Sequence, residues 1–153
     1  MRRRDVHAPS RIFVYGTLLF DAVRARVAGR ALPGRSATLP GYARRAVHGA
    51  VYPGVVREPG AATQGLLVEG VDAGALARLD RFEGRLYERR RLPVRLAEGG
   101  FLHAGVYVVP PARRRALADA PWDPDAFAAA HLEAYLEGCA AFDLAQRRRG
   151  GPR

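Results

Sequence analysis

A short apolar stretch that stops at a glycine, residues 12–18 (I-F-V-Y-G-T-L), constrains the fold of this chain more than any other feature. Its first four residues are β-branched or aromatic, which favours a buried strand. Gly16 has no side chain and allows the close backbone approach that a ligand needs. We predict a strand over 11–15 and then a helix N-terminus, where the N–H groups of residues 16–18 form a seat for a carboxylate or an oxyanion.

A second stretch, residues 79–87, ends a predicted helix and carries a carboxylate. Leu79 and Phe82 mark the helix face that turns towards the core, and Glu83 lies four residues after Leu79 on the same face. Partial burial and the negative end of the helix dipole both raise the pKa of such a carboxyl group. The alternative is that Glu83 turns into solvent at a helix end capped by Gly84.

Length and composition predict one globular domain without a disulfide, a metal or a membrane span. A chain of 153 residues buries roughly 70% of its unfolded surface, and no apolar run reaches the ~20 residues of a membrane helix. Cys139 is the single cysteine, predicted to be a buried apolar residue, and the four histidines lack ligand spacing. The basic N-terminus has no apolar segment after it, so we expect no signal peptide and a cytoplasmic protein.

The formal net charge of +10 raises the question of nucleic-acid binding. Every basic residue is arginine, which fits a GC-rich coding bias as well as a binding surface, and the densest runs are Arg2–Arg4 and Arg147–Arg149. No basic patch is interleaved with aromatic residues in the way of single-strand binders. We therefore expect a diffuse charge and no specific nucleic-acid partner.

Glycine, proline and capping residues between the apolar patterns predict where the elements of the chain begin and end. We expect a disordered basic tail over 1–10, one domain over 11–145 and a basic tail over 146–153. The first half of the domain is predicted to contain a short helix ending near Gly29, an irregular segment or short edge strand over 31–41, a strand over 42–48, a short strand closed at 58–60, and a strand over 64–71. The second half is predicted to contain a helix over 73–82 capped by Asp72 and a hairpin of strands 87–97 and 101–109. One helical turn before residue 120 and a last helix from Asp123–Pro124 to about Ala145 follow.

The reactive side chains of the sequence limit the kinds of enzymatic reaction that it could catalyse. The two serines, Ser10 and Ser36, lie outside any G-x-S-x-G elbow, and no phosphate-binding glycine motif follows a strand. These absences leave carboxylate acid/base chemistry beside a backbone anion site. His131, on the last helix, is interpreted as a packing residue rather than a ligand. Tyr107, on the predicted strand 101–109, faces either a pocket or the opposite surface.

The pairing of Y-G-T-L with a later L-D-x-F-E-G-x-x-Y-x-R resembles the γ-glutamylcyclotransferase-like family, in its plant avirulence-induced branch. The W-D-x-x-x-F and H-L-x-x-Y patterns of the last helix add to this resemblance. It implies an α+β fold, a small closed or nearly closed mixed β-barrel flanked by helices. It also implies Glu83 as the catalytic acid/base and a substrate-binding set formed by Tyr15, Gly16, Thr17, Leu18, Tyr52 and Tyr87. For Tyr52, packing beside a proline turn is the alternative.

The resemblance implies an enzyme that needs no cofactor. A γ-glutamyl amine or γ-glutamyl amino acid would cyclise by attack of its own α-amine, giving 5-oxoproline and a free amine. The expected partner is this small molecule, with no metal, membrane or nucleic acid. A non-catalytic member that binds or senses a small ligand is the alternative function. One sequence leaves open the leaving amine and the oligomeric state.

Overall fold

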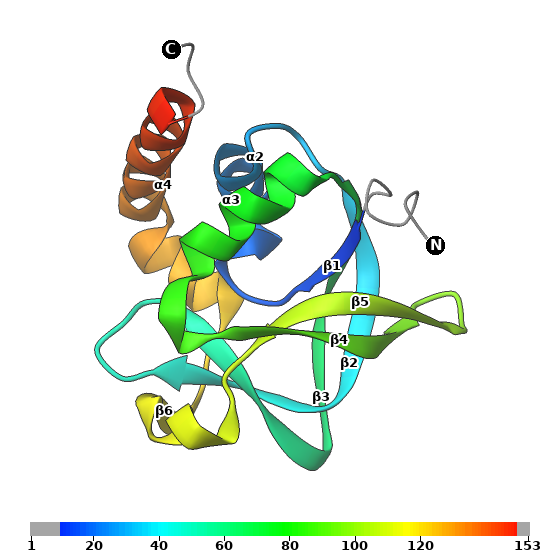
Figure 1. The fold of residues 1–153 in the computed structure, drawn as a ribbon. Helices are drawn as coiled ribbons and strands as arrows, with labels where there is room; N and C mark the ends of the chain where they lie inside the picture. The colour runs from blue at the N-terminus through cyan, green and yellow to red at the C-terminus, as the bar shows by residue number, and fades with distance from the viewer. Residues whose placement is uncertain (1–9, 150–153) are drawn as a thin grey trace.

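The computed structural model describes residues 10–149, which form six strands and a set of flanking helices (Figure 1). The strands are β1 (Ser10–Val14), β2 (Gly34–Val47), β3 (Pro53–Val71), β4 (Glu88–Leu96), β5 (Phe101–Val108) and β6 (Leu117–Pro121). The helices are η1 (Thr17–Leu19), α2 (Asp21–Ala28), α3 (Ala73–Glu83), η2 (Gly84–Leu86), η3 (Pro111–Ala116) and α4 (Pro124–Arg149).

Five of the strands close into a barrel. Their order is β3-β1-β5-β4-β2, and a further pairing of β2 with β3 completes the ring. β1 and β5 run parallel, whereas the other pairs are antiparallel. β6 extends the sheet beyond β2. The predicted closed mixed barrel flanked by helices is therefore confirmed.

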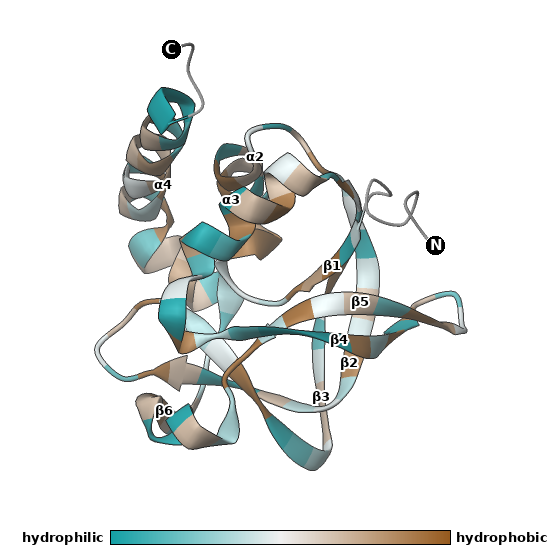
Figure 2. Ribbon diagram, viewed as in Figure 1, coloured by the Kyte–Doolittle hydropathy of each residue, from teal (hydrophilic) through white to brown (hydrophobic). Residues whose placement is uncertain are grey.

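The apolar residues form two main clusters on either side of the barrel wall, and β1 supplies both because its side chains alternate. Phe13 points into the barrel, where it packs with Leu39, Val94 and Val106. Ile12 and Val14 point outwards into the layer of helices. Figure 2 shows hydrophobic residues along β1, along β5 and on the sides of α2 and α3 that face the barrel. This alternation fixes the direction in which the chain leaves β1.

The helices on this outer layer are tied together by one arginine. Arg78 on α3 donates to the Val27 carbonyl of α2 at 2.8 Å and forms an ion pair with Asp143 of α4. In Figure 1, α2, α3 and α4 lie together on one side of the barrel. The C-terminal end of α3 is consequently held in place beside the end of β1.

Two strand predictions were wrong, and both errors have the same cause. β2 runs unbroken from Gly34 to Val47, where an irregular segment or a short edge strand was expected before residue 42, and β3 continues without a break through 58–60. The register of this pair jumps from Pro40 opposite Ala62 to Tyr42 opposite Arg57. Residues 58–61 and Gly41 (φ +83°) therefore form a bulge. A bulge tolerates proline and glycine inside a long bent strand, so these residues mark a barrel corner and not a strand end.

Other local predictions were confirmed with small shifts. The Asp72 carboxylate accepts the Ala75 N–H at 2.8 Å as the expected N-cap, and Gly29 ends α2 in the left-handed conformation. The last helix begins at Pro124 as predicted but extends to Arg149, four residues beyond the expected end. β6 was not predicted. The expected N-terminal tail lies outside the described residues except for Ser10, which is in β1.

The pairing of β1 with β3 depends on a missing side chain at Gly65. A Cβ atom at this position would lie 2.2 Å from the Val14 carbonyl oxygen and 2.6 Å from the Phe13 ring. We predict that Gly65→Ala destabilises the protein by roughly 1–3 kcal/mol in urea unfolding, because β1 must move away from β3.

A suitable control is Gly138→Ala on α4, where nothing lies within 4 Å of the added carbon. This change should stabilise the protein by roughly 0.5–1 kcal/mol, since alanine is the better helix former. Equal stability of the Gly65→Ala variant and the parent would contradict the observed packing of β1.

Candidate active site

A cavity of about 150 Å³ lies where the end of β1 meets the end of α3. The surrounding residues come from five parts of the chain and are mostly aromatic. They are Phe13, Val14, Tyr15, Gly16, Thr17, Leu18, Tyr52, Pro53, Phe82, Glu83, Tyr87, Tyr107 and Tyr135. Every residue that the sequence assigned to binding or catalysis is among them. The structure thus brings the two motifs, residues 12–18 and 79–87, to one place, while their chemical roles stay predictions.

The loop of residues 16–18 lines this cavity and has unpaired backbone N–H groups among the described residues. Within the described residues, the N–H groups of 16–18 donate to no protein acceptor, whereas the next N–H, of Leu19, bonds the Gly16 carbonyl at 2.9 Å. Free N–H groups at the start of a helical turn attract anionic oxygen. The turn, η1, is a single 3₁₀ turn, shorter than the helix expected directly after the glycine.

Two arginines hold the carbonyl groups on either side of this loop. Arg44 donates to the Tyr15 carbonyl at 2.9 Å, and the buried Arg24 donates to the Leu18 carbonyl at 2.9 Å. Gly16 itself lies against Pro53, because a Cβ atom would come within 2.8 Å of the Pro53 ring. The φ of Gly16 is −124°, outside the left-handed region, and the close approach to Pro53 leaves no room for a side chain here.

Glu83 is the last residue of α3 and the ionisable group of main interest. The residue is half-buried, and it lines the cavity together with five tyrosines. Burial, and secondly the nearby negative charge of Asp80, raise its pKa from 4.5 to about 8. The predicted direction is confirmed, and the alternative of a solvated helix end is wrong. The acidic neighbour, one helical turn earlier, was not part of the prediction.

Tyrosine hydroxyls complete the wall. Tyr87 donates to the Pro53 carbonyl at 2.6 Å, and Tyr15 donates to the Tyr107 carbonyl at 2.6 Å. Burial raises the pKa of Tyr15, Tyr87 and Tyr107 well above the usual value, and it raises the pKa of Tyr135 to about 12. These four tyrosines are neutral near neutral pH, whereas Glu83 is the carboxyl group of the cavity whose charge changes there.

Sequence reasoning missed part of the wall. Tyr107, whose direction was left open, lines the cavity, and so do Phe82 and Tyr135. Tyr135 also meets the Thr17 hydroxyl at 3.2 Å. A signal for Tyr135 was present in the H-L-x-x-Y pattern, because it placed a polar-tipped aromatic residue on the apolar face of the last helix.

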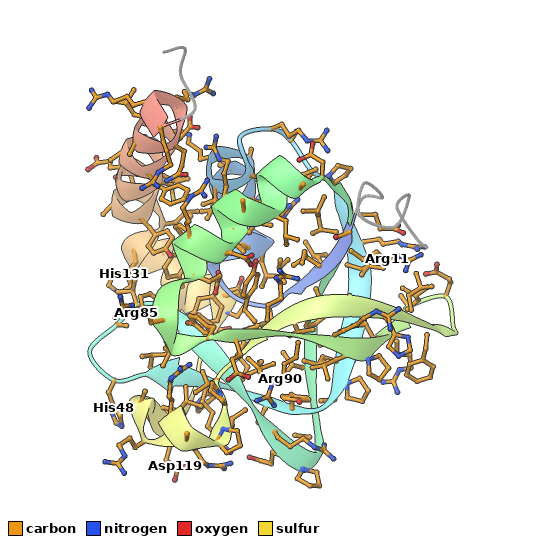
Figure 3. The ribbon with its side chains drawn as sticks, viewed as in Figure 1. Arg11, His48, Arg85, Arg90, Asp119 and His131 are labelled. Atoms are coloured by element: carbon orange, nitrogen blue, oxygen red, sulfur yellow. The ribbon has the colours of Figure 1, made fainter. Side chains whose placement is uncertain are left out.

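Residues outside the cavity offer less chemistry. Cys139 is buried as predicted, and burial raises the pKa of its thiol. His131, predicted to be a packing residue rather than a ligand, lies on α4 (Figure 3), where its ring packs beside that of Phe127 while the residue stays exposed. Among residues 10–149, no three His, Cys, Asp or Glu side chains gather as a metal site would require, and no helix has the length and apolarity to cross a membrane.

The fold and the cavity define a class: a small closed barrel with one carboxyl and a row of free N–H groups around a ring-sized space. The family model described as gamma-glutamyl cyclotransferase, AIG2-like, matches residues 12–124. The Arabidopsis thaliana protein named AIG2-like protein D is 31% identical over 133 residues, which cover 82% of this chain and 84% of that protein. The chain belongs to the gamma-glutamyl cyclotransferase, AIG2-like family.

Solved structures agree with this assignment. A solution structure of an Arabidopsis thaliana protein superposes with a TM-score of 0.67 at 26% identity. The superposition covers 94% of this chain and 86% of the Arabidopsis chain. A protein named gamma-glutamyl cyclotransferase superposes with a TM-score of 0.61 and covers 87% of each chain. Its identity of 19% shows a shared fold alone.

The raised pKa of Glu83 makes a prediction about stability. Between pH 4.5 and about 8 the folded protein keeps a proton on Glu83 that the unfolded chain has lost, so stability falls as pH rises through this window. A glutamine side chain does not ionise, so the variant lacks this pH-dependent loss of stability. We predict that Glu83→Gln raises the thermal unfolding midpoint by several degrees more at about pH 9 than at about pH 5.

The control is Glu133→Gln, which changes an exposed residue of α4. Its effect should be small and the same at both pH values. A gain for Glu83→Gln that does not depend on pH would contradict a raised pKa at this position.

Proposed function

We propose that the cavity binds the γ-glutamyl part of a γ-glutamyl amine or γ-glutamyl amino acid and converts it to 5-oxoproline and a free amine. The observation that carries this proposal is the placement of a carboxyl with a pKa of about 8 in the same small cavity as the free N–H groups of residues 16–18. Family membership supports the reaction class, and the geometry supports the assignment of parts.

The size of the cavity agrees with this substrate. An engineered cavity of similar volume binds benzene, so about 150 Å³ suits one small ring. The product 5-oxoproline is a five-membered ring, and a glutamyl group folded for cyclisation occupies a similar space. The leaving amine would then lie at the mouth, next to Tyr52, which is 38% exposed.

The reaction needs no protein nucleophile. The α-amine nitrogen attacks the γ-carbonyl carbon, which forms the ring bond and places negative charge on the carbonyl oxygen. The N–H groups of residues 16–18 stabilise this oxygen or the substrate carboxylate, and each well-placed donor contributes ~3 kcal/mol. Collapse of the intermediate breaks the bond to the leaving amine. No water is consumed.

Glu83 moves the proton in this scheme. Its carboxylate takes a proton from the attacking amine, and its carboxylic acid then gives that proton to the leaving nitrogen. A pKa of about 8 suits both steps, because the group is a stronger base than a free carboxylate yet still ionises near neutral pH. The proton balance over the cycle is zero.

We predict that the purified protein releases 5-oxoproline from at least one member of a panel of γ-glutamyl amines and dipeptides, without added metal or nucleotide. Since the carboxylate is the working form in the first step, kcat/KM should rise with pH and level off above about pH 8. Quantification of 5-oxoproline by mass spectrometry across the pH range measures both.

Two variants test the assignment of the proton shuttle. Glu83→Gln keeps the shape of the side chain but removes the base, so kcat should fall by ~10²–10⁴. Glu133→Gln should retain parental turnover. An active Glu83→Gln variant would move the role to another group, whereas inactivity of the parent on the whole panel would favour a member that binds a small ligand without turning it over.

A further inference from the structure

Asp80 lies outside the cavity lining, yet it is bonded to two elements of the cavity region. The Tyr107 hydroxyl donates to one Asp80 carboxylate oxygen at 2.6 Å. Arg89 donates to both oxygens, at 2.9 and 3.2 Å. A two-pronged arginine pair of this kind fixes the orientation of the carboxylate as well as its charge.

Through Tyr107 this pair reaches the opposite side of the cavity. The hydroxyl of Tyr107 binds Asp80, and the carbonyl of the same residue accepts the hydrogen bond of the Tyr15 hydroxyl at 2.6 Å. One residue of β5 thus connects α3 with the end of β1. The aromatic ring of Tyr107 between these two bonds forms part of the cavity wall.

We propose that Asp80 is the positioning residue of this site: held by Arg89 and Tyr107, it fixes the wall that joins the two motifs and keeps a negative charge one helical turn from the Glu83 carboxyl. Residues three apart on a helix are neighbours on its surface, which places Asp80 beside Glu83 on α3. The positive charge of Arg89 offsets part of this negative charge, so the Asp80–Arg89 pair sets how strongly Asp80 acts on the Glu83 carboxyl. The inference rests on the proposed function of Glu83.

The surroundings of Glu83 contain few other charges. The titratable groups that line the cavity with it from the remaining elements are the tyrosine hydroxyls of Tyr15, Tyr52, Tyr87, Tyr107 and Tyr135. Asp80 is the charged group that acts on Glu83 directly, and Arg89 acts through it. Removing the charge of either member of the pair should therefore shift the titration midpoint of Glu83, in one direction for Asp80 and in the opposite direction for Arg89.

Opposite signs separate an electrostatic role from simple loss of structure. Asp80→Asn removes a negative charge, so the titration midpoint of Glu83 should fall by about one pH unit. Arg89→Gln breaks the same ion pair but leaves the negative charge uncompensated, so the midpoint should rise by about half a unit. Arg89→Lys keeps the positive charge and should leave the midpoint within about 0.2 units of the parent.

The measurement is a carboxyl ¹³C NMR titration of the substrate-free protein at low ionic strength, with the Glu83 signal assigned by its absence in Glu83→Gln. Because no turnover is needed, the result does not depend on whether the correct γ-glutamyl substrate has been found. Where substrate is known, the pH midpoint of kcat/KM should move in the same directions.

The matched control is Asp143→Asn. Asp143 also pairs with an arginine of α3, Arg78, but neither residue lines the cavity. This variant should leave the Glu83 midpoint unchanged even though it weakens the packing of α4. Shifts of the same sign in Asp80→Asn and Arg89→Gln, or no shift in Asp80→Asn, would overturn the proposal.

Discussion

The short strand β1 is the element on which the rest of this structure depends. It is five residues long, and it pairs with β3 on one side and β5 on the other. Phe13 and Ile12 are almost completely buried on opposite faces, so β1 can neither slide nor rotate without losing one of the two apolar clusters. The chain that leaves β1 therefore has a fixed starting point. That point is where the free N–H groups of residues 16–18 lie.

The site shows how a barrel of this size raises the pKa of a carboxyl group. The cavity wall is almost entirely aromatic and aliphatic, and the hydroxyls of Tyr15 and Tyr87 donate to backbone carbonyls. Such a wall removes water from the Glu83 carboxyl without supplying a cation to compensate, and Asp80 adds a like charge nearby. Both effects favour the protonated form. The protein keeps a costly group at the end of α3, which is the pattern expected of an acid/base residue.

Much of the fold was readable from the sequence where a local signal and the final contacts agree. The apolar run before Gly16, the Asp72 cap and the glycine pair of the β4–β5 hairpin all act within a few residues, and the structure contains each of them. The long strands were not readable. Pro40 and Pro59 stop a strand in most contexts, and only the pairing across the bulge shows that here they bend it.

The same distinction applies to the site. Residues 16–18 and Glu83 were singled out by the glycine after a buried strand and by an acidic residue on an apolar helix face, and the resemblance of both motifs to a known family added Tyr15 and the predicted roles. Tyr107, Tyr135 and the Asp80–Arg89 pair belong to the site through contacts between residues 9 to 118 positions apart in the chain. No periodicity in one sequence encodes such contacts. Asp80 in particular was only a second carboxylate near Glu83 until the structure placed Arg89 and Tyr107 against it.

The central claim is that the N–H groups of residues 16–18 and the Glu83 carboxyl face one small ligand in one cavity. A ¹H–¹⁵N NMR titration of the protein with 5-oxoproline tests it most directly. We predict saturable shifts that are largest at the amides of Gly16, Thr17 and Leu18, with smaller shifts at Glu83 and none in the last turns of α4. Absence of saturable shifts at residues 16–18, or saturable binding centred elsewhere on the barrel, would contradict it.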